Sequence, residues 1–140
     1  MTEVLTTLRL EYVDGDTWTL LEPFAVASSV LGGRFDVGLP FTTDFNSTPR
    51  PLWPLFPPTE DGEAAVVHDK LYRDGTWNGT PITRALADQV HREFLIWKGA
   101  PAWKVTAMYR GLRWFGWRAW GRYRAQESGV PAAVENAVKG

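Results

Sequence analysis

The chain has 140 residues, which is the length of one domain and enough to bury a core without disulfide or metal support. Its 15 basic and 16 acidic side chains give a net charge of −1, which excludes a polycation that coats nucleic acid by charge alone. The absence of cysteine excludes disulfide frameworks, thiolate metal sites and cysteine nucleophiles.

The first 60 residues have the pattern of strands and loops. Apolar and polar residues alternate over Leu8–Tyr12 and again over Thr17–Leu20, on either side of a turn at Asp14-Gly15-Asp16, which predicts a hairpin. A further short strand is expected at Arg34–Val37, because Gly32-Gly33 precede this segment and Gly38-Leu39-Pro40 follow it. Six prolines between positions 40 and 58 predict a stiff, extended Pro-rich loop, because proline lacks a backbone donor.

The second half of the chain has helical periodicity. Asp61 is the expected cap of a first helix that begins near Gly62 and ends before Gly75. Its inner face comprises Ala64, Val67, His68, Leu71 and Tyr72. A second helix is expected to begin near Thr80-Pro81 or at Thr83 and to end at Gly99. Its repeating apolar positions are Leu86, Val90, Phe94 and Trp97.

A third helix is predicted to begin at Pro101 and to continue past position 120. Its apolar stripe consists of Val105, Met108, Leu112, Phe115, Ala119 and Tyr123. We therefore expect a single α+β domain over residues 1–125: a small N-terminal antiparallel sheet or hairpin, the Pro-rich loop, and three helices. Residues 126–140 are expected to be a C-terminal tail.

The chain contains only two histidines, so imidazole chemistry requires His68 or His91. Helical phase places His68 on the apolar face, where an imidazole needs a hydrogen-bond partner. Asp44, which lies among aromatic residues in the Pro-rich loop, is the expected carboxylate that orients His68 as a general base. The alternative for His68 is a core histidine that attaches the loop to the helix, and the alternative for Asp44 is an Asx-turn.

Two further carboxylates complete the candidate cluster. Asp69 lies about 100° round the helix from His68 and is expected as a second ligand or a wall of the same cleft. Asp88 shares a helix face with His91 and could point to that cleft. Asp69 and Asp88 are thus candidate ligands of a divalent metal, although the sequence requires no cofactor. The alternative for Asp88 is a helix-surface carboxylate, and His91 is expected to be solvated.

Charge is unevenly distributed, since residues 1–60, 61–97 and 98–140 carry net charges of −5, −2 and +6. On a helical wheel, the third helix carries aromatic and cationic side chains opposite its apolar stripe. These are Trp103, Arg110, Trp114, Trp117 and Arg118. Because Trp and Arg dominate binding hot spots and also suit an anionic bilayer, this face predicts a protein-binding or membrane-binding surface. Internal packing under the sheet or the Pro-rich loop is the alternative.

The motifs that contain these residues resemble an uncharacterised phage and prophage family, domain of unknown function 1353. The matching elements are Leu39–Arg50 (LPFTTDFNSTPR), 52–58 (LWPLFPP), Ala64–Tyr72 (AAVVHDKLY) and Ala87–His91 (ADQVH). The resemblance covers roughly residues 35–121. One glycine of the family pattern is absent between Pro40 and Phe41, and His91 stands where the family has an apolar or aromatic residue. The resemblance implies phage or prophage origin but no established activity.

This origin favours a virion or assembly component, at the tail or neck, that binds a phage structural protein through its Trp/Arg-rich helix. The alternative is a small hydrolase of the bacterial envelope that uses His68, Asp44 and Asp69, with or without a metal. We expect the virion or the host cytoplasm as location, because no run approaches roughly 18 apolar residues and the start lacks a standard signal peptide. Bulk nucleic-acid binding is not expected. Binding to a membrane surface and formation of a homo-oligomer are both compatible with the sequence.

Overall fold

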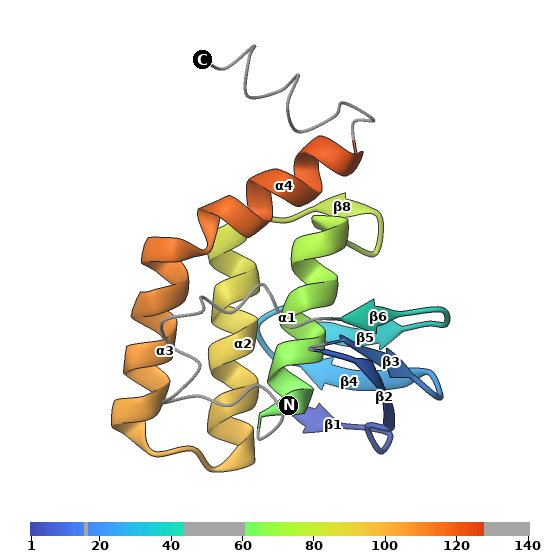
Figure 1. The fold of residues 1–140 in the computed structure, drawn as a ribbon. Helices are drawn as coiled ribbons and strands as arrows, with labels where there is room; N and C mark the ends of the chain where they lie inside the picture. Colours follow the sequence, from blue (N-terminus) through green and yellow to red (C-terminus); the bar gives the residue numbers. More distant parts are fainter. Residues whose placement is uncertain (16, 44–60, 128–140) are drawn as a thin grey trace.

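The computed structural model describes residues 1–15, 17–43 and 61–127. Strands from the N-terminal part of the chain form one side of the molecule, and helices from the second half form the other (Figure 1). The fold class is therefore α+β, as predicted. The strands are β1 (Glu3–Val4), β2 (Leu10–Asp14), β3 (Thr17–Leu20), β4 (Phe24–Ser28), β5 (Gly33–Val37), β6 (Thr42–Thr43), β7 (Thr76–Trp77) and β8 (Thr80–Pro81). The helices are α1 (Gly62–Asp74), α2 (Arg84–Lys98), α3 (Ala102–Phe115) and α4 (Trp117–Glu127).

The strands form two small antiparallel sheets, ordered β1-β4-β5 and β2-β3-β6, and the β7-β8 hairpin. The predicted hairpin is confirmed, because β2 and β3 pair with Leu10 opposite Leu20. The predicted strand at positions 34–37 lies within β5. Strand β4 was not predicted, although Phe24 and Val26 are fully buried in the core. Its apolar run is continuous, as expected of a strand that is covered on both faces, and it therefore lacks the alternation that marks β2.

Helices α1 and α2 lie side by side and begin and end where the sequence predicts. Gly75 and Gly99 both adopt the left-handed conformation after the last helical turn, with φ of 66° and 91°. Thr83 caps α2, since its side chain accepts from the backbone N–H of Leu86 at 3.1 Å. Asp61 is the N-cap residue of α1, as predicted, but its side chain makes no cap hydrogen bond. It instead pairs with Lys104 Nζ on α3 at 3.0 Å.

The predicted third helix is divided in two at Gly116, so the structure has α3 and α4 where one helix was expected. A Cβ atom at Gly116 would lie 2.4 Å from the Tyr72 hydroxyl and 2.6 Å from the Leu112 carbonyl oxygen. Only glycine therefore allows α1 and the end of α3 to approach this closely. Phe115, the last residue of α3, is exposed, so its predicted place in the core stripe is wrong.

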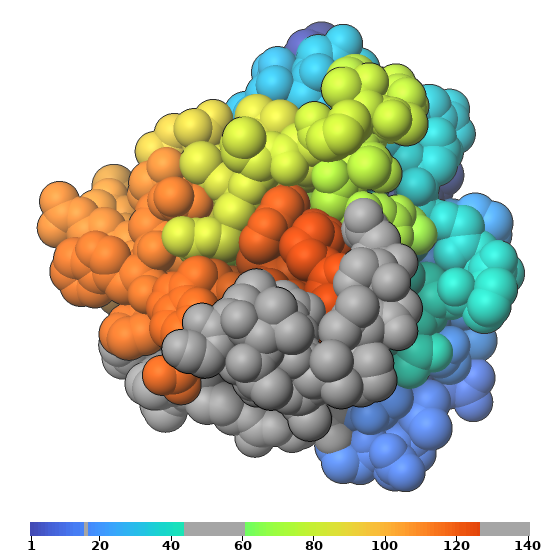
Figure 2. All heavy atoms as spheres, turned by 90° about the horizontal axis from the view of Figure 1, so that it is seen from above, coloured from blue at the N-terminus to red at the C-terminus, as the bar shows by residue number. Residues whose placement is uncertain are grey.

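Helix α4 crosses the C-terminal end of α1 (Figures 1 and 2). Arg124 Nη2 donates to the carbonyl oxygens of Tyr72 and Arg73, at 2.6 and 2.7 Å. These carbonyl oxygens belong to the last turn of α1, where a helix has no backbone N–H groups of its own to donate to them. Helix α4 continues to Glu127, and the remainder of the predicted tail, 128–140, lies outside the described residues. No helix of the described ranges is long and apolar enough to span a membrane.

Candidate functional site

His68 and Asp88 form a buried pair between α1 and α2. The His68 Nε2 and Asp88 Oδ1 atoms are 2.9 Å apart, and both side chains are 0% exposed. An ionised carboxylate only accepts hydrogen bonds, so the Nε2–H of His68 is the donor and its tautomer is set. Asp44, the predicted partner of His68, lies outside the described residues. Within those residues, the carboxylate that holds His68 is Asp88.

Asp88 also accepts from three other side chains. Tyr72 donates to Oδ1 at 2.6 Å, and Arg113 and Arg84 donate to Oδ2 at 2.9 and 3.4 Å. Burial alone would raise the pKa of Asp88, but the contacts with His68, Tyr72 and Arg113 outweigh it and hold that pKa below its usual 3.8. Burial and the charge of Asp88 raise the pKa of Tyr72. The alternative of a helix-surface carboxylate is thus wrong for Asp88.

Asp69 belongs to a separate cluster on another side of α1. Its Oδ2 accepts from Arg73 at 2.9 Å and its Oδ1 from the Tyr123 hydroxyl at 3.0 Å, and Thr43 donates a further hydrogen bond. Burial raises the pKa of Asp69 despite the opposing charge of Arg73. Burial and then the charge of Asp69 raise the pKa of Tyr123 to about 12. Asp69 therefore connects α1 to α4 and β6 and does not contact the His68–Asp88 pair by any described hydrogen bond.

These contacts bear on the predicted metal site. Every carboxylate oxygen of Asp69 and Asp88 accepts from a protein donor. Across residues 1–15, 17–43 and 61–127, no three or more His, Asp or Glu side chains come together in a way that could hold a metal ion. The described part of the chain therefore supplies no observation from which to propose a metal.

His91 is buried, so the prediction that it is solvated is wrong. Only 2% of the residue is exposed, and its ring lies edge-on to that of His68, with 5.0 Å between the centroids. Its Nδ1 has no hydrogen-bond partner among the described groups. Burial, and then the nearby His68, lower the pKa of His91 well below its usual 6.5. His91 is therefore neutral in the folded protein at pH 7.

We expect His91 to make the protein sensitive to mild acid. Its depressed pKa means that only the unfolded chain takes up this proton below pH 6.5. The stability that a neutral His91 provides is therefore present above about pH 6.5 and falls as the pH is lowered, by at most about 1.4 kcal/mol per pH unit. His91→Phe removes this group and should lose less stability than the wild type between pH 7 and pH 5 in urea unfolding, by up to about 2 kcal/mol. An unchanged pH dependence in this variant would assign the acid sensitivity to other groups.

Helix α3 and the start of α4 carry exposed aromatic and cationic side chains. Trp114, Phe115 and Trp117 are 68%, 52% and 56% exposed, and Trp103 is also exposed. Arg110 and Arg118 are exposed beside them, and the guanidinium of Arg118 lies 5.2 Å from the Trp117 ring. We call this set the Trp/Arg surface: Trp103, Arg110, Trp114, Phe115, Trp117 and Arg118. All five predicted partner-binding residues are thus exposed, and the alternative of internal packing is wrong for Trp114 and Trp117.

The charges of this surface are not balanced by described neighbours. Neither Arg110 nor Arg118 forms an ion pair with any residue that the structure describes, and the same holds for exposed Arg122 on α4. Arg113 differs, because its side chain turns inwards to Asp88. The surface therefore presents positive charge together with aromatic rings.

The model of one protein family, described as protein of unknown function (DUF1353), matches residues 18–112. This range includes most of β3, all of β4 to β8, both buried carboxylate clusters except Tyr123 and Arg113, and most of α3. No curated protein and no solved structure matches the chain.

Proposed function

The chain belongs to the DUF1353 family, and from this premise we propose that it is a phage or prophage virion or assembly component that binds an acidic neighbouring subunit. The Trp/Arg surface is the observation that carries this proposal. Trp114, Phe115 and Trp117 expose three large rings within four positions of the chain. Several large apolar side chains exposed close together are typical of binding sites, and Trp and Arg are among the residues most enriched at hot spots.

The charge of the surface specifies the partner. Arg110, Arg118 and Arg122 lack acidic partners among the described residues, so an acidic protein surface would complete them. Arg118 is also placed over Trp117, where its cation–π contact orients both side chains before binding. We therefore expect a partner with carboxylates around an apolar pocket that accepts an indole ring.

The buried cluster supports this surface from inside. Arg84 donates to the carbonyl oxygens of Leu112 and Arg113, at 2.8 and 3.0 Å, and so secures the end of α3. Arg113 in turn donates to Asp88, and Trp114 is the next residue in the chain. The polar cluster therefore fixes the segment that carries the exposed rings, which lowers the entropy lost when a partner binds.

The test is incorporation into phage particles in a host where this chain is supplied from a plasmid. Trp114→Ala combined with Trp117→Ala should reduce the amount of chain in purified particles at least about tenfold, because each lost hot spot costs about 2 kcal/mol. The matched control is Val13→Ala with Leu21→Ala, which removes two exposed apolar side chains from the sheet side. Circular dichroism and thermal melting should show both double variants folded.

Three outcomes would contradict the proposal. Normal incorporation of the Trp variant would show that the surface binds no particle subunit, and unfolding of that variant would show that the rings belong to the core. Flotation of the purified wild type, but not of the Trp variant, with phosphatidylglycerol vesicles would assign the surface to a membrane instead. Light scattering of the purified chain distinguishes self-association from binding to a different subunit.

The envelope hydrolase remains a prediction that rests on the His68–Asp88 pair. A histidine held by a carboxylate is the arrangement of a general base. Here, however, His68, Asp69 and Asp88 are all 0% exposed, and their described contacts join helices to one another. This geometry favours a structural role, and variants of His68 separate the two functions, as described below.

A further inference from the structure

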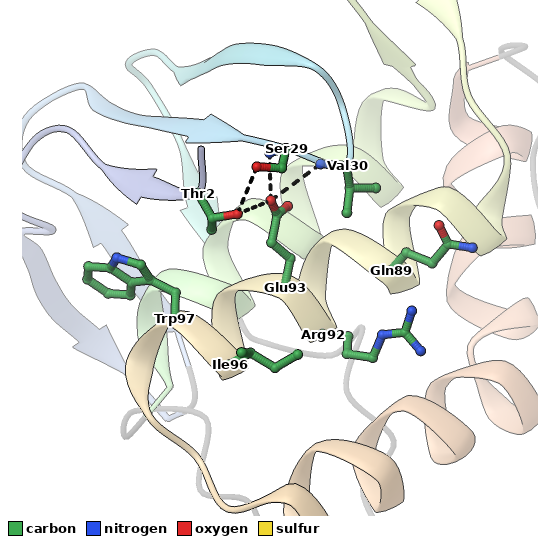
Figure 3. Close-up of a pocket in the computed structure, with 8 residues that line it drawn as sticks. All are labelled: Thr2, Ser29, Val30, Gln89, Arg92, Glu93, Ile96 and Trp97. Atoms are coloured by element: carbon green, nitrogen blue, oxygen red, sulfur yellow. Dashed lines mark hydrogen bonds between the residues drawn. The ribbon is translucent and has the colours of Figure 1, made fainter.

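A pocket of about 350 Å³ lies between the turn after β4 and the outer face of α2 (Figure 3). It is separate from the Trp/Arg surface, because its residues come from the N-terminus, the turn after β4, and α2. Its volume is within the range of sites that take small ligands. The lining residues are Thr2, Ser29, Val30, Gln89, Arg92, Glu93, Ile96 and Trp97.

Glu93 holds the wall of this pocket in place. Its carboxylate accepts from the Ser29 N–H at 2.6 Å, from the Val30 N–H at 3.3 Å and from the Thr2 hydroxyl (Figure 3). It also accepts from the Ser28 hydroxyl at 2.6 Å. These donors engage both oxygens of the Glu93 carboxylate and direct it towards the turn. They also fix the turn against α2, so the pocket is formed before any ligand arrives.

The remaining lining side chains give the pocket an apolar part and a cationic end. Ile96 and Trp97 provide exposed apolar walls at one end, although the periodicity of α2 predicts Trp97 in the core. Gln89 and Arg92 lie towards the other end, and Val30, also exposed, lies on the Gln89 side of Glu93 (Figure 3). The Arg92 guanidinium lies 4.4 Å from the Tyr109 ring and forms no ion pair with a described carboxylate. The aromatic contact positions this charge without neutralising it.

We infer that the pocket binds an apolar group that ends in a carboxylate. The apolar body would lie along α2 against Val30, Ile96 and Trp97, and the carboxylate would accept hydrogen bonds from Arg92 and the Gln89 amide. Gln89 and Ile96 are seven residues apart on α2, which corresponds to about 10 Å and therefore to a short aliphatic chain or one apolar residue at a chain end. A free fatty acid and the C-terminus of a protein both have this chemistry.

The test uses octanoate and the eight indole N–H signals of the ¹⁵N-labelled protein, with the Trp97 signal assigned through Trp97→Phe. Octanoate should shift the Trp97 signal in a saturable manner, whereas octylammonium, which has the opposite charge, should not. Arg92→Gln should weaken octanoate binding at least about fivefold. The matched control is Arg9→Gln, before β2 on the sheet side, which also removes an exposed arginine and should leave the affinity unchanged.

Ile96→Trp fills the pocket from an exposed position and should abolish the octanoate shift without loss of stability. The inference is overturned if octanoate leaves the Trp97 signal in place, if octylammonium binds equally well, or if Ile96→Trp binds like the wild type. An acetylated tetrapeptide ending in Leu, compared with its C-terminal amide, distinguishes the two sources. Tighter binding of the free-acid peptide than of octanoate identifies a protein C-terminus as the ligand, and the reverse order identifies a fatty acid.

Discussion

Asp88→Ala should lower the free energy of unfolding by about 3–5 kcal/mol, which is the cost of leaving buried charges without their partner. The substitution removes the acceptor shared by His68, Tyr72, Arg84 and Arg113. Of these, His68 and Tyr72 are fully buried and cannot turn to solvent. Urea unfolding followed by circular dichroism measures the effect. Because the alanine variant can fail to fold, Asp88→Asn, which keeps one acceptor oxygen, should give a smaller loss that is still measurable.

Two comparisons make the Asp88 prediction specific. Asp36→Ala breaks the exposed Arg34–Asp36 pair and should change stability by less than about 1 kcal/mol. The pKa of Asp88 is lowered from 3.8, so the stability that its charge provides is present above pH 3.8 and is lost as the pH falls through the lower, folded value. Asp88→Asn should lose this acid dependence. A wild-type unfolding midpoint for Asp88→Ala would show that the cluster does not stabilise the fold.

His68→Ala should destabilise the protein by about 2–4 kcal/mol, because it opens a cavity between α1 and α2 and removes a buried donor from Asp88. His68→Gln is the informative companion. A glutamine amide can donate to Asp88 in place of the imidazole Nε2–H, but it cannot act as a base at neutral pH. We therefore expect His68→Gln to recover most of the lost stability, together with incorporation into particles.

The same pair of variants tests the hydrolase alternative. If His68 is a general base, wild-type protein releases products from bacterial envelope preparations, and His68→Gln abolishes this release while remaining folded. That outcome would replace the structural role of His68 with a catalytic one. Recovery of stability and of particle incorporation by His68→Gln would instead show that the imidazole is needed as a donor only.

The ends of α1 and α2 could be predicted from the sequence, because each depends on the backbone conformation of a single residue. Gly75 and Gly99 mark helix ends because each adopts a left-handed conformation that other residues avoid. The break at Gly116 could not be found in this way, because its backbone is right-handed and helical, with φ −70° and ψ −15°. The apolar stripe continues across it in phase. The need for glycine at this position comes from Tyr72, 44 positions earlier, whose hydroxyl occupies the space beside it.

The same distinction holds for the candidate site: contacts within one helix follow from the sequence, whereas contacts between helices do not. Pairs within one helix, Asp69 with Arg73 and Arg84 with Asp88, have the i, i+4 spacing that a sequence displays. The pairing of His68 with Asp88 depends on how two helices face one another, and Arg113 reaches that carboxylate from a third helix. No spacing rule connects them. The prediction for His91 was wrong for a related reason. A polar side chain was expected to be exposed to solvent, whereas the position of His91 on α2 directs its ring towards His68 on α1.

The convergence of three helices on one carboxylate has a consequence for folding. Donors from α1, α2 and α3 share the Asp88 carboxylate, so all of its contacts are made only when the three helices have packed together. We therefore expect these helices to fold as one cooperative unit, in which the exposed rings of α3 reach their final arrangement only when the core is complete. If the Trp/Arg surface is the assembly site proposed above, a chain that has not completed its core presents no competent binding surface, and incompletely folded copies stay out of the assembly without any separate checkpoint.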